Sequence, residues 1–211
     1  MELQQPQETK FDKDRWIYPY TNMVTIFMIL FMILFVFAYT GSKVYYEKML
    51  LSIESSLGKQ TQADLAVLDI AENLQRYIFN QGIERLVKIE VRPDRIKLVL
   101  SNPILFDSGS AELKESPILY QIRELLRQIP NNVVIEGHTD NLPVGPKCKY
   151  RSNLELSGAR AFSLLKFMID GGLDPKRFRA MGCGENVPLM PNDTEENRRY
   201  NRRVEINILR D

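Results

Sequence analysis

The sequence predicts an α+β fold in which a single N-terminal transmembrane helix precedes one mixed helix and sheet domain. Three observations support this prediction. Residues 16–39 contain no Asp, Glu, Lys, Arg or His. After residue 86 the apolar residues change from helical to alternating spacing, which is typical of strands with one buried face. The chain of 211 residues leaves room for one domain of ordinary size after the helix.

The hydrophobic run from Trp16 to Tyr39 is long enough to cross a membrane. At ~1.5 Å rise per residue it forms a helix of roughly 35 Å, and a hydrocarbon core is ~30 Å thick. A signal peptide would have an apolar region of about 7–15 residues, and a buried soluble helix would carry a polar stripe. We interpret residues 16–41 as an uncleaved transmembrane helix and residues 1–15 as a cytoplasmic tail. The basic residues around the run give a small positive-inside bias for this orientation.

Charge and cysteine content narrow the classes of function. The 28 Lys and Arg residues balance 27 Asp and Glu residues, so the net charge of +1 indicates no nucleic-acid partner. Cys148 and Cys183 could form a disulfide outside the cytoplasm, or remain free thiols. No catalytic triad or metal-ligand set can be recognised around His138, the single histidine. We therefore expect no metal, no cofactor and no enzymatic activity.

Residues 42–85 are expected to form an amphipathic helical linker. The apolar residues of 42–57 lie near one face of a helix, which could run beside the membrane or in a coiled dimer. Residues 58–62 break this pattern. A second helix is predicted over residues 63–80, and Gly82 can close it.

From Leu86 to the C-terminus the spacing predicts a sheet with helices on one face. The last expected helix has the clearest start signal, because Ser152 and Glu155 fit a capping box. Pro93-Asp94 is the expected turn of a hairpin. The expected elements are, in order, strands at 87–91 and 96–100, a loop at 102–110, a helix at 112–129, a strand at 133–136, a helix from 152 to 170, a strand at 177–181, a tight loop at 182–185 and a strand at 204–209.

Four motifs in residues 86–211 resemble the OmpA-like peptidoglycan-binding domain. They are FDSGSAEL at Phe106–Leu113, Thr139-Asp140, LSGARA at Leu156–Ala161 and NRRV at Asn201–Val204. The long loop after Asp140 is similar to the MotB branch of the family, which includes the ZorB subunit of Zorya phage-defence complexes. This resemblance implies a homodimeric inner-membrane stator subunit inside a multi-pass MotA/ZorA-like ring, with a periplasmic domain on peptidoglycan.

The resemblance also implies a site for the diaminopimelate stem peptide. A free diaminopimelate end presents a carboxylate and an ammonium together, so its site needs one cationic and one anionic group. Arg160 suits the carboxylate, because a guanidinium can bind it bidentately, and Asp140 suits the ammonium. The alternative is a surface ion pair worth ~0–1 kcal/mol. The same motifs imply four further pocket residues, Asn141, Asn153, Leu156 and Arg203.

The transmembrane run departs from the MotB pattern at one position. MotB-like stators carry a membrane Asp whose protonation drives rotation, and this sequence has Asn22, which has no titratable proton. Asn22 and Thr25 lie one turn apart on one helix face. Three explanations remain open: an introduced Asp→Asn substitution, a natural variant that binds an ion through its amide, or loss of transport. The function is thus an ion-driven stator subunit, flagellar or Zorya-type, or a structural tether between inner membrane and peptidoglycan.

Overall fold

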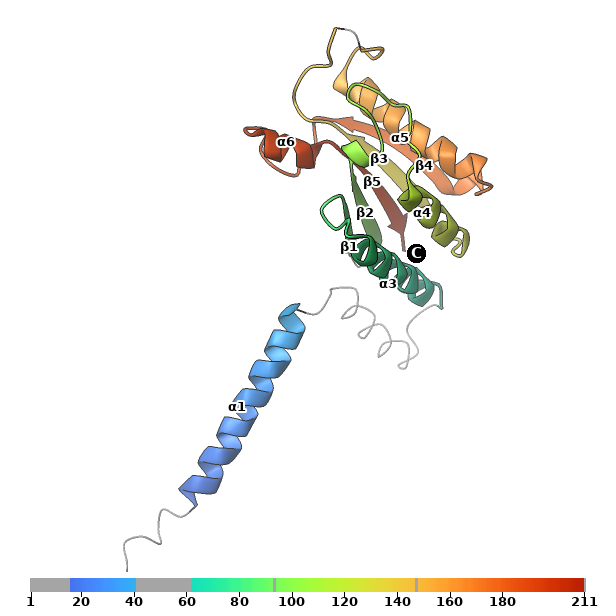
Figure 1. Cartoon of the computed structure of the whole chain (residues 1–211). Coiled ribbons are helices and arrows are strands. Elements are labelled where there is room, and N and C mark those ends of the chain that lie inside the picture. The colour runs from blue at the N-terminus through green and yellow to red at the C-terminus, as the bar shows by residue number, and fades with distance from the viewer. Residues whose placement is uncertain (1–15, 41–61, 93, 147, 211) are drawn as a thin grey trace, which may run out of the picture. The chain divides into compact units, whose positions relative to one another are not determined.

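The computed structural model describes residues 16–40, 62–92, 94–146 and 148–210 (Figure 1). The chain divides into two units, residues 1–42 and residues 43–211. The expected tail at residues 1–15 and the expected amphipathic helix at 42–57 lie outside the described residues.

The first unit contains one long helix, α1 (Ile17–Thr40), as the hydrophobic run predicts. Within the described residues it is the one helix long and apolar enough to cross a membrane, over Ile17–Val36. Its large apolar side chains are exposed in the isolated unit; Phe31 is 66% exposed. A bilayer would therefore cover a continuous apolar surface of α1.

The second unit is built on a five-stranded sheet with the strand order β1-β2-β5-β3-β4. Only β3 and β4 pair in parallel, and the other neighbouring strands are antiparallel. The last strand therefore lies in the middle of the sheet, between the N-terminal hairpin and the parallel pair. The strands are β1 (Val87–Val91), β2 (Arg95–Ser101), β3 (Val133–His138), β4 (Phe178–Gly184) and β5 (Arg203–Leu209).

Three helices cover one face of this sheet (Figure 1). The alternation of β5 shows why, because Val204, Ile206 and Ile208 belong to the apolar core shared with the helices. Arg203 and Glu205 lie on the opposite face. The α+β prediction with helices on one face is thus confirmed. The helices of this unit are α3 (Gln62–Gln81), α4 (Pro117–Arg127), α5 (Asn153–Asp170) and the short α6 (Glu195–Asn201), with 3-10 turns at Asn102–Ile104 and Pro175–Arg177.

Helix α3 shares the core of the sheet domain although it precedes the expected domain boundary at residue 86. Leu68, Leu74 and Ile78 are almost fully buried in the same cluster as the strand side chains. Burying a side chain of this size stabilises a fold by about 1.5–3 kcal/mol. Gly82 closes the helix with a φ of 64°, as predicted. The boundary itself stays a prediction.

Helix α4 begins five residues later than the sequence pattern indicates. It starts at Pro117, and Ser116 before it is extended, with φ −138° and ψ 125°. A proline disfavours the helical conformation of the preceding residue and is well placed at the first helical position. The helix therefore begins at Pro117, and residues 112–116 precede it.

One prediction near the C-terminus was wrong, and one helix there was not predicted. Residues 182–184 continue strand β4, because the parallel ladder with β3 extends to the pair His138 and Gly184. The segment before β5 forms α6, where the Oγ1 atom of Thr194 accepts a hydrogen bond from the amide of Asn197 at 3.1 Å. This short charged helix has no apolar periodicity that would reveal it.

Candidate functional site

The N-terminus of α5 is fixed by a capping arrangement close to the expected one. The Oγ of Ser152 accepts a hydrogen bond from the amide of Glu155 at 3.1 Å. The Oε2 of Glu155 accepts in return from the amide of Arg151 at 2.7 Å, one residue before the cap. Both bonds satisfy amides that the helix leaves free, so they set where α5 begins.

Helix α5 lies against β3 and β4 at backbone distance. A Cβ atom on Gly137 would lie 2.1 Å from the carbonyl oxygen of Ser157, so this approach requires glycine. The Ser157 hydroxyl accepts from the amide of Gly184 at 2.9 Å and donates to the carbonyl of Leu154 at 2.8 Å. These contacts hold the first half of α5 in one position on the sheet.

Arg160 projects from this half of α5 and is only 3% exposed. Its Nε donates to the carbonyl of Ser110 at 2.9 Å and its Nη2 to that of Asp107 at 3.3 Å. The guanidinium also lies over the ring of Phe106, 5.5 Å from the centroid. Burial lowers the pKa of Arg160 to about 10, although the charge of Asp140 opposes the shift. The FDSGSAEL motif therefore orients a buried cation.

Asp140 lies just after β3, is 6% exposed and already has an ionic partner. Its Oδ2 accepts from Nη1 of Arg202 at 2.6 Å, and its Oδ1 accepts from the amide of Leu142 at 3.3 Å. The Nη2 of Arg202 donates to Glu195 at 2.5 Å. Burial lowers the pKa of Arg202, but these bonds to Glu195 and Asp140 outweigh it and raise that pKa above its ordinary value.

Asn153 holds the loop that carries Asp140. Its Nδ2 donates to the carbonyls of Asp140 at 3.2 Å and Leu142 at 2.8 Å, and to the carboxylate of Glu185 at 2.9 Å. Asn141, which follows Asp140 in the chain, is exposed, and Leu156 is 5% exposed. The structure therefore brings Asp140, Asn153 and Arg160 into one site. We call these three residues together with Arg202 the Asp140–Arg160 site.

Arg203 does not join the Asp140–Arg160 site, contrary to the expectation from its motif. It is 2% exposed, and its Nε donates to Oε1 of Glu205 at 2.7 Å on the sheet face away from α5. Its other donors bind the carbonyls of Asn201 and Val187, both at 3.2 Å. Arg202, which the sequence reasoning did not select, contacts Asp140 instead. The NRRV motif contains both arginines side by side, so the sequence offered Arg202 as well as Arg203 as a candidate site residue.

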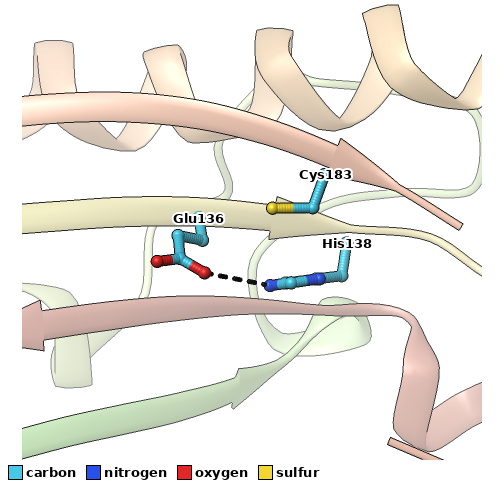
Figure 2. A group of neighbouring side chains, drawn as sticks. All are labelled: Glu136, His138 and Cys183. Carbon is cyan, nitrogen blue, oxygen red and sulfur yellow. Dashed lines mark ion pairs between the residues drawn. The ribbon is translucent and has the colours of Figure 1, made fainter. Parts of the chain in front are cut away.

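The disulfide considered from the sequence is not formed, because both cysteines are free thiols. Cys148 donates through Sγ to the carbonyl of Gly109 at 3.3 Å, next to the segment that orients Arg160. Cys183 lies on β4 beside Glu136 and His138 (Figure 2).

The two polar residues singled out in the membrane run lie in the first half of α1. The Thr25 hydroxyl donates to the carbonyls of Thr21 at 3.0 Å and Asn22 at 2.9 Å. Such bonds within the helix satisfy a hydroxyl where a bilayer supplies no water. The side chain of Asn22 is exposed in this unit, so it is free to face a partner helix. Its part in an ion pathway stays a prediction.

Comparison with known proteins identifies the family of the chain. Residues 105–202 match the OmpA family. Motility protein B of Bacillus subtilis is 33% identical over 67% of this chain, which spans about half, 55%, of that protein. A MotB-like protein of Desulfovibrio vulgaris superposes with a TM-score of 0.61 at 30% identity, over 68% of this chain and 93% of that one. The cell wall anchor of the T6SS from Pseudomonas aeruginosa gives a TM-score of 0.60 at 32% identity, over 65% of this chain and 97% of that one. The chain is therefore a MotB-like protein whose C-terminal domain is OmpA-like.

Proposed function

We propose that this protein anchors a membrane assembly to the cell wall by binding peptidoglycan through the Asp140–Arg160 site. The observation that carries the proposal is the buried guanidinium of Arg160, which backbone carbonyls orient and which interacts electrostatically with the carboxylate of Asp140. The cell wall anchor of Pseudomonas aeruginosa, which has the same fold at 32% identity, supports it. The site contains no nucleophile and base pair, so binding rather than catalysis is the function we assign.

The ligand chemistry follows from the donors and acceptors that the site leaves available. Arg160 has five N–H donors, and two of them bind carbonyls within the described residues. The remaining donors on Nη1 and Nη2 suit the carboxylate of a free diaminopimelate end. Asp140 accepts two bonds of about four available to a carboxylate, so it can also accept from the ligand ammonium. Arg202 holds that carboxylate in place while the ligand binds.

Binding to isolated sacculi tests the site directly. Arg160→Ala removes the carboxylate partner and Asp140→Ala removes the ammonium partner, so we expect both variants to lose sedimentation with sacculi. Lys166→Ala is a matched control, because Lys166 is a cation on the exposed face of α5. Retention of binding by both site variants, at the level of the control, would refute the assignment.

The membrane part of the proposal is a stator-like arrangement. We propose that α1 crosses the inner membrane with the N-terminus in the cytoplasm, and that the OmpA-like domain lies in the periplasm. The likeness to Motility protein B supports a stator role with a MotA-like partner, and we propose a homodimer packed inside a multi-pass ring of that partner. Co-purification with such a ring protein from native membranes tests this arrangement. A flagellar or a Zorya-type system would each be a specialisation of it.

A tether without ion transport is the second candidate, and Asn22 favours it. Residues 16–40 contain no acidic side chain, so α1 cannot carry protons through a carboxylate. Restoring the acid in Asn22→Asp and measuring proton flux through the assembly separates the two candidates. A motor whose site is blocked should gain flux with Asp, whereas a tether should not. An Asn22→Asp assembly that is intact but conducts no protons would eliminate the ion-driven function.

A further inference from the structure

The sheet face opposite α5 carries a second polar cluster that peptidoglycan binding does not use. Glu136 and His138 lie two residues apart on β3, so their side chains project from the same face. Cys183 on the neighbouring strand β4 points its sulfur toward them (Figure 2). The ligand atoms of the three residues lie within 4.8 Å of one another. A carboxylate, an imidazole and a thiol therefore meet at one point.

His138 is the unusual member of this cluster, because its hydrogen-bonding groups are unsatisfied. Its side chain is 1% exposed, and neither Nδ1 nor Nε2 has a hydrogen-bond partner within the described part of the chain. Buried polar groups normally have partners, because losing water without replacement costs free energy. Nε2 lies 3.7 Å from Oε2 of Glu136, too far for a hydrogen bond. A group between the two atoms would satisfy both.

That separation suits two ligands of one tetrahedral metal ion. Zinc lies ~2.0–2.1 Å from nitrogen and oxygen ligands, so two such ligands are roughly 3.3 Å apart. The Nε2 to Oε2 distance of 3.7 Å needs only a small contraction to reach this value. The two side chains are thus already placed for chelation.

A β-bulge brings the thiol to the same point. The register of β3 and β4 shifts between Gly137 and His138, so Cys183 is the extra residue between Gly182 and Gly184. Bulges redirect side chains and are frequent next to functional sites. Cys183 and Glu136 are both partly exposed, which gives an ion a way in from solvent.

The charged residues around the cluster leave the carboxylate of Glu136 available to bind an ion. Glu205 on β5 also faces His138, with Oε1 3.8 Å from Nε2, but both of its oxygens are occupied. Oε2 pairs with Nζ of Lys97 at 2.6 Å and Oε1 pairs with Nε of Arg203 at 2.7 Å. Glu205 is therefore already paired with two cations, and Glu136 remains available for an ion.

We propose that Glu136, His138 and Cys183 form a binding site for a divalent zinc-like metal ion. Imidazole, thiolate and carboxylate are the ligands that zinc uses, and three protein ligands leave a fourth position open for water or a partner group. Burial, followed by the charges of Glu136 and Glu205, raises the pKa of the Cys183 thiol. Metal binding replaces the S–H bond with an S–metal bond and releases the proton to solvent, so affinity falls as pH falls.

Cobalt(II) titration of the purified full chain in detergent, with a phosphine reductant and no histidine tag, tests the site. We expect near-ultraviolet thiolate-to-cobalt charge transfer together with visible bands of tetrahedral cobalt, and we expect zinc to abolish both. Cys183→Ser should lose the charge-transfer band. Cys148→Ser is the matched control and should keep it, because Cys148 contacts Gly109 in a different loop.

The unsubstituted chain alone can overturn the proposal, so the test does not depend on a variant that folds. Absence of the charge-transfer band with cobalt in excess would refute the site, as would a band that survives Cys183→Ser. Glu136→Gln and His138→Gln should each weaken cobalt binding at least ~10-fold, and unchanged affinity in both would refute the ligand set. Sedimentation with sacculi is measured on the same samples. It reports the Asp140–Arg160 site separately, so either proposal can fail alone.

Discussion

Arg202 and Arg203 are neighbours in the sequence but belong to two regions with different electrostatics. The Arg202 side chain is 25% exposed and bridges Asp140 to Glu195, which is 53% exposed. The Arg203 side chain is 2% exposed and pairs with Glu205, which is 1% exposed. Arg202 ends α6, whereas Arg203 begins β5 and its side chain lies on the sheet face away from α5, so one step along the chain separates a partly exposed ionic bridge from a buried ion pair. Loss of a carboxylate partner should therefore have very different consequences in the two regions.

The largest loss of stability is expected at the buried pair of Arg203 and Glu205. Glu205→Ala would leave the Arg203 guanidinium buried without a carboxylate, which costs about 3–5 kcal/mol of unfolding free energy. Urea unfolding of the detergent-solubilised chain, followed by circular dichroism, measures it. Glu90→Ala is the control, since Glu90 pairs with Arg92 at 3.0 Å on the surface and should change little. Equal losses for the two variants would contradict the burial argument.

The second-largest effect is expected where α5 packs on the sheet, on the face opposite the pair of Arg203 and Glu205. Gly137→Ala places a methyl group 2.1 Å from the Ser157 carbonyl, so α5 must move away from β3. Such overpacking costs about 1–3 kcal/mol, and the shift should also weaken binding to sacculi by displacing Arg160. Thermal unfolding and sedimentation with sacculi measure the two consequences. Gly145→Ala, whose added methyl group meets no atom within 4 Å, should leave both unchanged.

The fold was largely predictable from the sequence because it depends on local periodicity. The strands β1, β2, β3 and β5 and the helices α1, α3 and α5 follow from apolar spacing and from caps at Ser152 and Gly82. The start of α4 was missed because Pro117, which occupies the first helical position, was placed in the interior of the predicted helix. Helix α6 was missed because its residues are polar on every side.

The candidate site was less predictable because it depends on contacts between distant segments. The motifs gave Asp140, Asn153 and Arg160, which the structure brings together. They could not show that the carbonyls of Asp107 and Ser110 hold Arg160, across 50 residues or more of chain. Choosing Arg202 over Arg203 required knowing that β5 begins at residue 203. The cluster of Glu136, His138 and Cys183 arises only from the parallel register of β3 and β4.

A smaller effect is expected at the cap that begins α5. Ser152→Ala removes the acceptor for the Glu155 amide and should cost about 1 kcal/mol of unfolding free energy. Ser152→Asp should restore most of it, because a carboxylate accepts the same bond. Ser116 is a matched control, since it precedes α4 without a side-chain capping bond, and Ser116→Ala should cost less. If Ser116→Ala lost more unfolding free energy than Ser152→Ala, the capping bond of Ser152 would not explain the difference between the two variants.

The smallest effect is expected at Glu195, the exposed partner of Arg202. Hydrogen bonds from Arg202 and then Arg198 hold the pKa of Glu195 below its ordinary value of 4.5. A carboxyl whose pKa is lower in the folded state stabilises the fold fully above about pH 4.5 and loses this contribution as pH falls through the folded pKa. Glu195→Gln should therefore reduce stability slightly at neutral pH and flatten its decline below pH 4.5. High salt should diminish the difference, because solvent ions screen an exposed pair and do not reach the buried pair of Arg203 and Glu205. The difference in stability is measured from the unfolding midpoints of the unsubstituted chain and of Glu195→Gln across acidic pH, at low and at high salt. A difference that does not change with salt would mean that Arg202 is held as tightly as Arg203.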